Sequence, residues 1–164
     1  SVENLNGTVL ASPDAQLKYL KPGRNAFDQD LIQIAIEHVQ TGDSVWDIGA
    51  NIGVFTVASS LRPRNGTIVA VEADTWLAGL LRKTAARKEY SQSDICVVPA
   101  AISKKNSISS FMIASRGRAS NALTQARARS QMGGGTREVQ YVPTLTLDTL
   151  LDAFSSPDFT KIDI

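Results

Sequence analysis

The sequence predicts an α/β fold built on a doubly wound parallel sheet, and three observations carry this prediction. Short apolar runs such as Val45–Ile48 and Thr67–Val71 alternate with segments whose apolar residues recur at helical spacing. The first run breaks into glycines at Gly49 and Gly53 before a helical pattern resumes. The second run ends in an acid, Glu72. A glycine-rich turn followed by an acid on the next strand is how α/β folds hold the ribose of an adenosine.

Length and composition bound the class of protein. A chain of 164 residues with 43% hydrophobic residues allows a sizeable core, and we expect one domain over 1–164 that begins with an extension over 1–27. The net charge of +1 gives no overall attraction to nucleic acid or to a membrane. No apolar run approaches the roughly 18 residues of a membrane span. The one cysteine, Cys96, lies in an apolar run, so we expect a buried packing residue and a reducing, cytoplasmic environment.

Helices and strands alternate from residue 28 to residue 98. Helical spacing predicts a helix over 28–40, and Asp74 offers an N-cap for a helix over 74–88, with Trp76 on its apolar side. The other predicted elements are strands over 44–48, 67–72 and 94–98 and a helix over 54–62. His38, the only histidine, is expected on the surface or at a helix end, and a catalytic base is the alternative.

Residues 104–146 interrupt this alternation. Strand patterns over 107–114 and 139–147 flank a polar segment that contains Gly133–Gly135. We expect an antiparallel insertion before the fourth parallel strand, and the second pattern places Val139, Tyr141 and Leu145 on one face. No acid occurs between residues 95 and 137, whereas the basic residues there are Lys104, Lys105, Arg116, Arg118, Arg127, Arg129 and Arg137. This basic segment is either a solvated loop or a lid that meets an anionic substrate.

The glycine-rich turn separates two classes of cofactor. Dinucleotide sites use G-x-G-x-x-G and place a pyrophosphate on the helix N-terminus. Here the spacing is Gly49-x-x-x-Gly53, and Asp47 precedes the first glycine by two residues. A carboxylate would repel a pyrophosphate, but it suits S-adenosylmethionine, which carries an ammonium and a sulfonium and no phosphate. The pattern D-x-G-x-N-x-G is the first motif of class I methyltransferases; a glycine turn without a ligand is the remaining alternative.

An ordered set of segments extends this motif. The chain carries VWDIGANIGVFTV, TIVAVEAD, VVPAAIS, LTLDTLL and KIDI in that order, and this set resembles the FkbM family of S-adenosylmethionine-dependent methyltransferases over roughly 28–164. The resemblance implies the Rossmann-like fold of class I methyltransferases. Family members usually continue the last segment with Glu-Gly, and their sheet has about seven strands. We therefore expect the C-terminal strands to be absent and the natural protein to continue past Ile164.

The motif and the resemblance together assign roles to residues. The cofactor-binding candidates are Asp47, Gly49, Ala50, Asn51, Gly53, Glu72, Ala100 and Ala101. The turn is expected to lie against the methionine part of the cofactor, with Asp47 near its ammonium and Glu72 accepting from the ribose hydroxyls. Ala100 and Ala101 leave room for an adenine ring. Apart from the alternative reading of His38, Asp163 is the one candidate base, by position alone, with a structural or orienting role as its alternative. No metal ligand is predicted.

The resemblance also implies an acceptor class. It points to O-methylation of a hydroxyl on a sugar or polyketide-type small molecule, and the basic segment suits an anionic or carrier-bound one. An RNA or protein acceptor is one alternative, although nucleic acid is disfavoured because no aromatic residues are interleaved with the arginines. A module that binds the cofactor without catalysis is the other, since a fold alone does not decide function.

Overall fold

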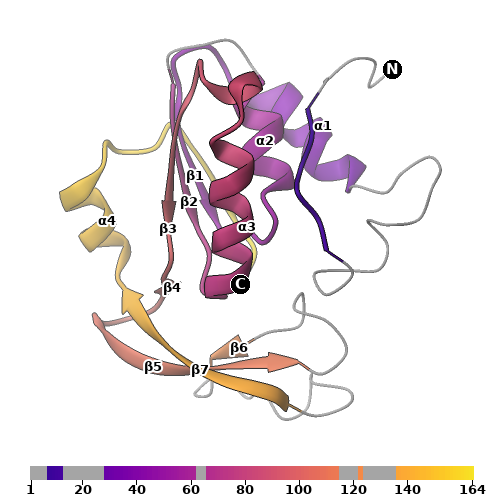
Figure 1. Cartoon of the computed structure of the whole chain (residues 1–164). Coiled ribbons are helices and arrows are strands. Elements are labelled where there is room, and N and C mark those ends of the chain that lie inside the picture. Colours follow the sequence, from indigo (N-terminus) through magenta and orange to yellow (C-terminus); the bar gives the residue numbers. More distant parts are fainter. Residues whose placement is uncertain (1–6, 13–27, 62–65, 115–121, 124–135) are drawn as a thin grey trace.

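The computed structural model describes residues 7–12, 28–61, 66–114, 122–123 and 136–164 (Figure 1). Most of the N-terminal extension, residues 1–6 and 13–27, lies outside the described residues, as does the segment 62–65. So do the tri-glycine stretch and four arginines of the basic segment, namely Arg116, Arg118, Arg127 and Arg129.

A four-stranded parallel sheet forms the centre of the structure. Across the sheet the strands are β3 (Asp94–Val98), β2 (Thr67–Val71), β1 (Ser44–Ile48) and β8 (Phe159–Ile162). The strands predicted over 44–48, 67–72 and 94–98 are confirmed, with their ends displaced by no more than one residue. β1 lies between β2 and β8, and Asp47 pairs with Ala70 on one side and Lys161 on the other. The carboxyl ends of all four strands therefore meet at one edge, beside the first glycine turn.

Helices cover both faces of this sheet because successive strand residues point to opposite faces. Val45 and Ile68 pack with α1 (Gln29–His38) and α2 (Val54–Ser60). Trp46 and Val69 pack on the other face, against Leu150 of α4 (Leu147–Ala153). Figure 1 shows α1, α2 and α3 on one side of the sheet and α4 on the other. The predicted doubly wound α/β fold is confirmed. Among the described helices, none combines the length and apolarity that crossing a membrane requires.

Asp74 begins α3 (Thr75–Ala85) as predicted, since its side chain accepts from the backbone N–H groups of Trp76 and Leu77. The helix ends three residues earlier than expected, and a 3-10 turn, η2 (Lys88–Tyr90), follows. The buried stripe of α3 consists of Leu77, Ala78, Leu81 and Thr84. The placement of Trp76 on this apolar side is wrong, because its side chain lies beside the stripe and is exposed.

The predicted insertion is confirmed and forms a second sheet. Its order is β4 (Ala101–Ile102), β7 (Thr136–Leu145), β5 (Ser107–Ala114) and β6 (Ala122–Leu123). β5 pairs antiparallel with β7, while β4 pairs parallel with it. In Figure 1 this sheet lies beyond the carboxyl edge of the parallel sheet. It packs there through Ala101, Phe111, Ile113 and Val142, with Ala73 from the loop after β2.

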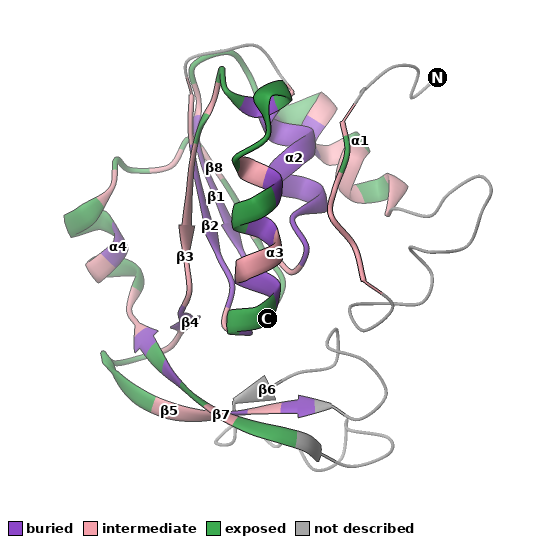
Figure 2. Ribbon diagram, viewed as in Figure 1, coloured by how far each residue is buried: buried purple, intermediate pink, exposed green. Residues whose placement is uncertain are grey.

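Buried and exposed residues both occur along the β5–β7 ribbon (Figure 2). Phe111 and Val142 point to the buried face, whereas Ile108, Val139 and Tyr141 point to solvent, with Tyr141 78% exposed. Val139 and Tyr141 do share a face, as predicted, but that face is the outer one. Leu145, which was predicted on the same face, is instead partly buried against the core of the parallel sheet. Helical or strand periodicity identifies a common face; only the docking of the ribbon decides which face is buried.

Cys96 is half-buried, so the expectation of a buried residue is wrong. In the part of the chain that the structure describes, β3 is an edge strand of the parallel sheet, and its residues from Ile95 to Val98 are only partly covered. Partial burial, together with the neighbouring Asp94, raises the pKa of the Cys96 thiol.

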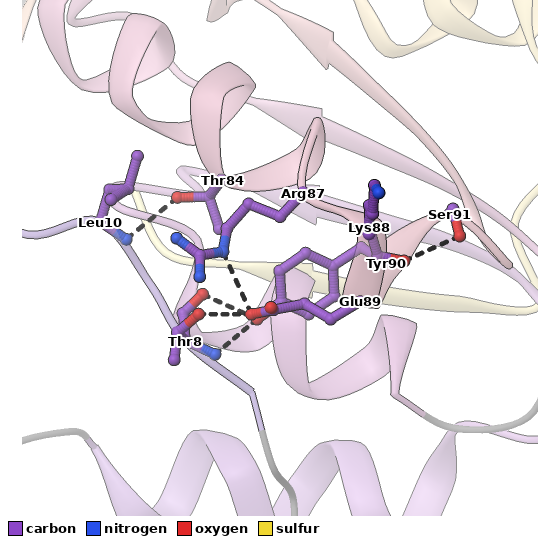
Figure 3. Close-up of polar contacts among 8 residues, drawn as sticks. All are labelled: Thr8, Leu10, Thr84, Arg87, Lys88, Glu89, Tyr90 and Ser91. Atoms are coloured by element: carbon purple, nitrogen blue, oxygen red, sulfur yellow. Dashed lines mark hydrogen bonds and ion pairs between the residues drawn. The ribbon is translucent and has the colours of Figure 1, made fainter.

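Residues 7–12 of the N-terminal extension run across α3 and η2 (Figure 3). The buried Tyr90 hydroxyl donates to the Thr8 carbonyl at 2.7 Å and accepts from the Thr8 N–H at 2.6 Å. The Leu10 N–H donates to the Thr84 hydroxyl at 3.1 Å, and the Thr8 hydroxyl donates to Glu89. Val9 and Ala11 pack against the cluster of Ile52, Val54 and Leu77. This segment therefore packs across α2 and α3 and helps to hold the two helices together.

Replacing Tyr90 with Phe should loosen this segment. The change removes both hydrogen bonds to Thr8 and leaves two backbone groups without their partner, which we expect to lower the free energy of unfolding by about 1–3 kcal/mol. Urea unfolding measures the loss. Tyr141→Phe is the matched control, because the Tyr141 side chain is exposed and its change should stay within about 0.5 kcal/mol. Equal stability of the two variants would contradict the role given to Tyr90.

Candidate functional site

The glycine turn over 49–53 joins the carboxyl end of β1 to α2. The N–H groups of Gly49 and Ala50 both donate to the Val71 carbonyl, at 2.9 and 3.0 Å, so the turn continues the β1–β2 ladder. Three of its residues have positive φ: Gly49 at 74°, Asn51 at 55° and Gly53 at 88°. Glycine adopts this region freely and asparagine tolerates it, which explains the residue types of the motif.

Gly49 also lies against the strand on the other side of β1. The Asp163 N–H donates to the Ile48 carbonyl at 3.0 Å, which extends the β1–β8 pairing by one residue. A Cβ at Gly49 would overlap with the Asp163 carbonyl oxygen and lie 2.9 Å from its carbonyl carbon. The first glycine of the motif is therefore required by a backbone on its neighbour strand as well as by its own φ.

Glu72 holds the turn from the side of β2. One carboxylate oxygen accepts from the Asn51 N–H at 2.7 Å, and the other accepts from the Asp74 N–H at 2.8 Å. One side chain thus ties the turn to the start of α3. Glu72 is only 7% exposed, and this burial raises its pKa to about 7, although the two backbone hydrogen bonds favour the charged form. Each oxygen retains a further lone pair for a ligand hydroxyl.

Asp47 is fully buried beneath the turn. One of its oxygens accepts from the backbone N–H of Thr56 at 3.1 Å and from the Thr56 hydroxyl at 2.6 Å. The other oxygen forms an ion pair with the Lys161 ammonium at 3.1 Å. The same ammonium donates to the Gly49 carbonyl at 2.9 Å. Asp47 therefore acts on the turn through protein groups.

Sequence reasoning missed Thr56 and Lys161 as members of this site. Thr56 follows Asp47 by nine residues and reaches it because α2 folds back over β1. Lys161 reaches it because Asp47 and Lys161 are paired residues of neighbouring parallel strands. The one available signal in the sequence was that WDI and KID carry charges of opposite sign, Asp47 and Lys161. It becomes informative only when the strand order places β8 beside β1.

The remaining candidates lie at the same edge of the sheet. Ala100 and Ala101 follow β3 and are buried, and Ala101 packs in the insertion cluster with Phe111 and Val142. Asp163 follows β8; its side chain is 78% exposed and lies 3.9 Å from the Lys161 ammonium. His38 lies at the opposite edge, where its ring stacks on Phe159, the first residue of β8, at a centroid distance of 5.9 Å.

Comparison with known proteins agrees with this arrangement. The profile of the Methyltransferase FkbM domain matches residues 47–164. The chain belongs to the FkbM methyltransferase family. This family uses S-adenosylmethionine as its methyl donor. The match begins at Asp47 and includes the glycine turn, Glu72, the insertion and β8.

Solved structures and curated proteins add little to the family assignment. The crystal structure of M.jannaschii tRNA m1G37 methyltransferase resembles this chain at 18% sequence identity, with a TM-score of 0.35. The similarity covers 48% of this FkbM chain and 26% of that protein's chain, so about a quarter of its length is matched. No curated protein matches the chain.

Adding a methyl group at Gly49 should lower the free energy of unfolding far more than adding one at Gly79. Gly49→Ala combines a positive φ with overlap against the Asp163 carbonyl, and we expect it to cost at least about 2–4 kcal/mol of unfolding free energy. Gly79 lies inside α3 with nothing within 4 Å of a Cβ. Gly79→Ala should therefore stabilise the FkbM domain by about 0.5–1 kcal/mol. Chemical unfolding of both variants measures the contrast, and a tolerated Gly49→Ala would refute the close approach of β8.

Proposed function

We propose that this FkbM domain binds S-adenosylmethionine at the carboxyl edge of its parallel sheet. On this proposal it transfers the methyl group to a hydroxyl of a sugar or polyketide-type small molecule. The observation that carries the proposal is the position of Glu72, whose carboxylate spans the glycine turn and the start of α3. A carboxylate there is placed to accept hydrogen bonds from the ribose hydroxyls of an adenosine.

The residues at this edge fit the chemistry of that cofactor. Glu72 has acceptor capacity for the two ribose hydroxyls beyond the backbone groups that it already binds. The turn formed by Gly49, Ala50, Asn51 and Gly53 would hold the methionine part. Ala100 and Ala101, which have the smallest side chains that still carry a Cβ, would border the adenine.

Asp47 contributes to this site indirectly on our proposal. Its oxygens are engaged by Thr56 and Lys161, and it has no exposed surface. It would act near the cofactor ammonium by holding the turn in place, with Lys161 linking its charge to the Gly49 carbonyl.

The cofactor supplies a methyl group on a sulfonium, which is an already activated leaving group. The protein then needs mainly to align the acceptor hydroxyl with that methyl, and alignment contributes much of the rate in such displacements. A base must also take the hydroxyl proton. We assign this task to Asp163, which leaves the carboxyl edge beside Gly49 with its side chain in solvent.

The acceptor that we propose is a small molecule with anionic character or on a carrier. Lys104 and Lys105 are exposed in the loop that enters the insertion, at the same edge of the sheet. No acid occurs between residues 95 and 137 of the sequence to offset this charge. The single cysteine fits the reducing cytoplasm that we propose as the place of the reaction.

Cofactor affinity should depend on pH through Glu72. Ribose hydroxyls donate to the ionised carboxylate, so below pH 7 binding must first remove a proton from Glu72. We expect the Kd for S-adenosylmethionine to be roughly tenfold higher at pH 6 than at pH 8, measured by titration calorimetry. Glu72→Gln should bind at least about tenfold more weakly at pH 8 and converge with the wild type as the pH falls.

Two further measurements sharpen this test. Glu37→Gln changes an exposed acid of α1 and should keep the wild-type profile. The demethylated product should bind the wild-type chain at the same site. If a folded wild-type chain binds neither molecule while it binds NADH, the methyltransferase proposal is wrong.

Replacing Asp163 with Asn should separate catalysis from cofactor binding. The amide has similar size but is no base, so we expect the turnover number to fall by about 10²–10⁴ while the cofactor Kd changes less than about threefold. Methyl transfer from labelled cofactor measures turnover, and calorimetry measures binding. Asp152→Asn, an exposed acid of α4, serves as control. Unchanged turnover in Asp163→Asn would remove Asp163 as the base.

A further inference from the structure

Lys161 contacts both Asp47 and the glycine turn, the two central parts of the candidate site. Sequence reasoning did not assign it to that site. Its ammonium lies 3.1 Å from Asp47 and 2.9 Å from the Gly49 carbonyl oxygen. Its side chain is only 11% exposed, although lysine is rarely buried. A lysine in this position has lost most of its hydration, so the contacts with its two partners must replace the contacts with water.

The ion pair alone gives little reason for this burial. The free energy lost when two charges leave water offsets much of the free energy gained from their attraction. Proteins in which apolar residues replace such a pair are therefore often as stable as the original. Here, however, the lysine makes a second, directed contact that no apolar residue could make. Its ammonium has three donors, and one of them holds the carbonyl of the first glycine of the turn. That contact serves the turn rather than the core.

The turn is held from both of its flanks. On one flank, Glu72 accepts from the Asn51 N–H and ties the turn to β2 and α3. On the other, Lys161 donates to the Gly49 carbonyl and ties the turn to β8. The Val71 carbonyl, which accepts from Gly49 and Ala50, holds the middle. Removing Lys161 would leave the β8 flank of the turn with only the packing of Asp163 and Ile164 against Gly49.

We propose that Lys161 is a positioning residue that orients the Gly49 carbonyl and so presents the glycine turn to the cofactor. The inference rests on the proposed function, because it assumes that the turn binds the methionine part of S-adenosylmethionine. Asp47 is then the counter-charge that keeps the buried ammonium in place, and Thr56 fixes Asp47. Lys161 also links the cofactor turn to Asp163, which directly follows β8 and whose carboxylate lies 3.9 Å from the Lys161 ammonium.

The test separates positioning from stability with a set of variants. Lys161→Met alone leaves the buried Asp47 carboxylate without its cation and should lower the denaturant midpoint of unfolding. The double variant Asp47→Asn, Lys161→Met removes both charges and should regain most of the denaturant midpoint, yet bind S-adenosylmethionine at least tenfold more weakly than wild type. Lys161→Arg restores a donor and a charge and should recover affinity to within about fivefold. Lys83→Met, an exposed lysine of α3, is the control and should leave both quantities unchanged.

A readout on the ligand-free protein makes the test independent of the cofactor. The amide hydrogens of Gly49 and Ala50 are bonded to Val71, and their exchange reports how firmly the turn is held. We expect these two amides to exchange at least tenfold faster in the double variant, while the amides of β2 stay as in wild type. Native exchange at the turn together with native affinity would overturn the role of Lys161. If the wild type binds no cofactor, the proposed function fails, and the exchange rates alone decide whether Lys161 holds the turn.

Discussion

The arrangement of this FkbM domain depends on one close approach, that of the β8 backbone to Gly49. The Asp163 carbonyl occupies the space that any side chain at Gly49 would need. This contact lets β8 continue its pairing with β1 past the strand ends, through the hydrogen bond from Asp163 to Ile48. The same register sets Lys161 opposite Asp47. A single glycine therefore allows the ion pair, the support of the turn and the exit of Asp163 at the carboxyl edge.

The charges around the turn are divided between two different environments. Beneath it, Asp47 and Lys161 neutralise one another in the interior, and Thr56 satisfies the second oxygen of the acid. At its other flank, two backbone N–H groups hold the Glu72 carboxylate, and burial brings its pKa to about 7. The interior pair is suited to holding shape. Glu72 is suited to exchanging a proton when a ligand arrives, and such perturbed groups are typical of functional sites.

Local sequence pattern was sufficient to predict the helices and strands, but it did not predict which of their side chains are exposed. The strands at 44–48, 67–72 and 94–98 were predicted from apolar runs, and the N-cap at Asp74 was predicted from residue type, because these signals are short-range. The exposure of Trp76, Tyr141 and Cys96 was not predictable in this way. Each depends on what packs against the element: a helix rotated on the sheet, a ribbon docked by one face, and a strand placed at an edge in the described part of the fold.

By itself, the sequence determined that the chain forms a doubly wound α/β domain with an antiparallel insertion. It also indicated that Asp47, the glycine turn and Glu72 belong to one site, since strand ends of a parallel sheet converge. Only the tertiary structure decided what those residues do to one another. It turned Asp47 inward to Thr56 and Lys161, and it set Glu72 on the backbone of the turn. The physical reason is that these contacts join residues up to 114 positions apart, and strand order, which brings them together, leaves no trace in local periodicity.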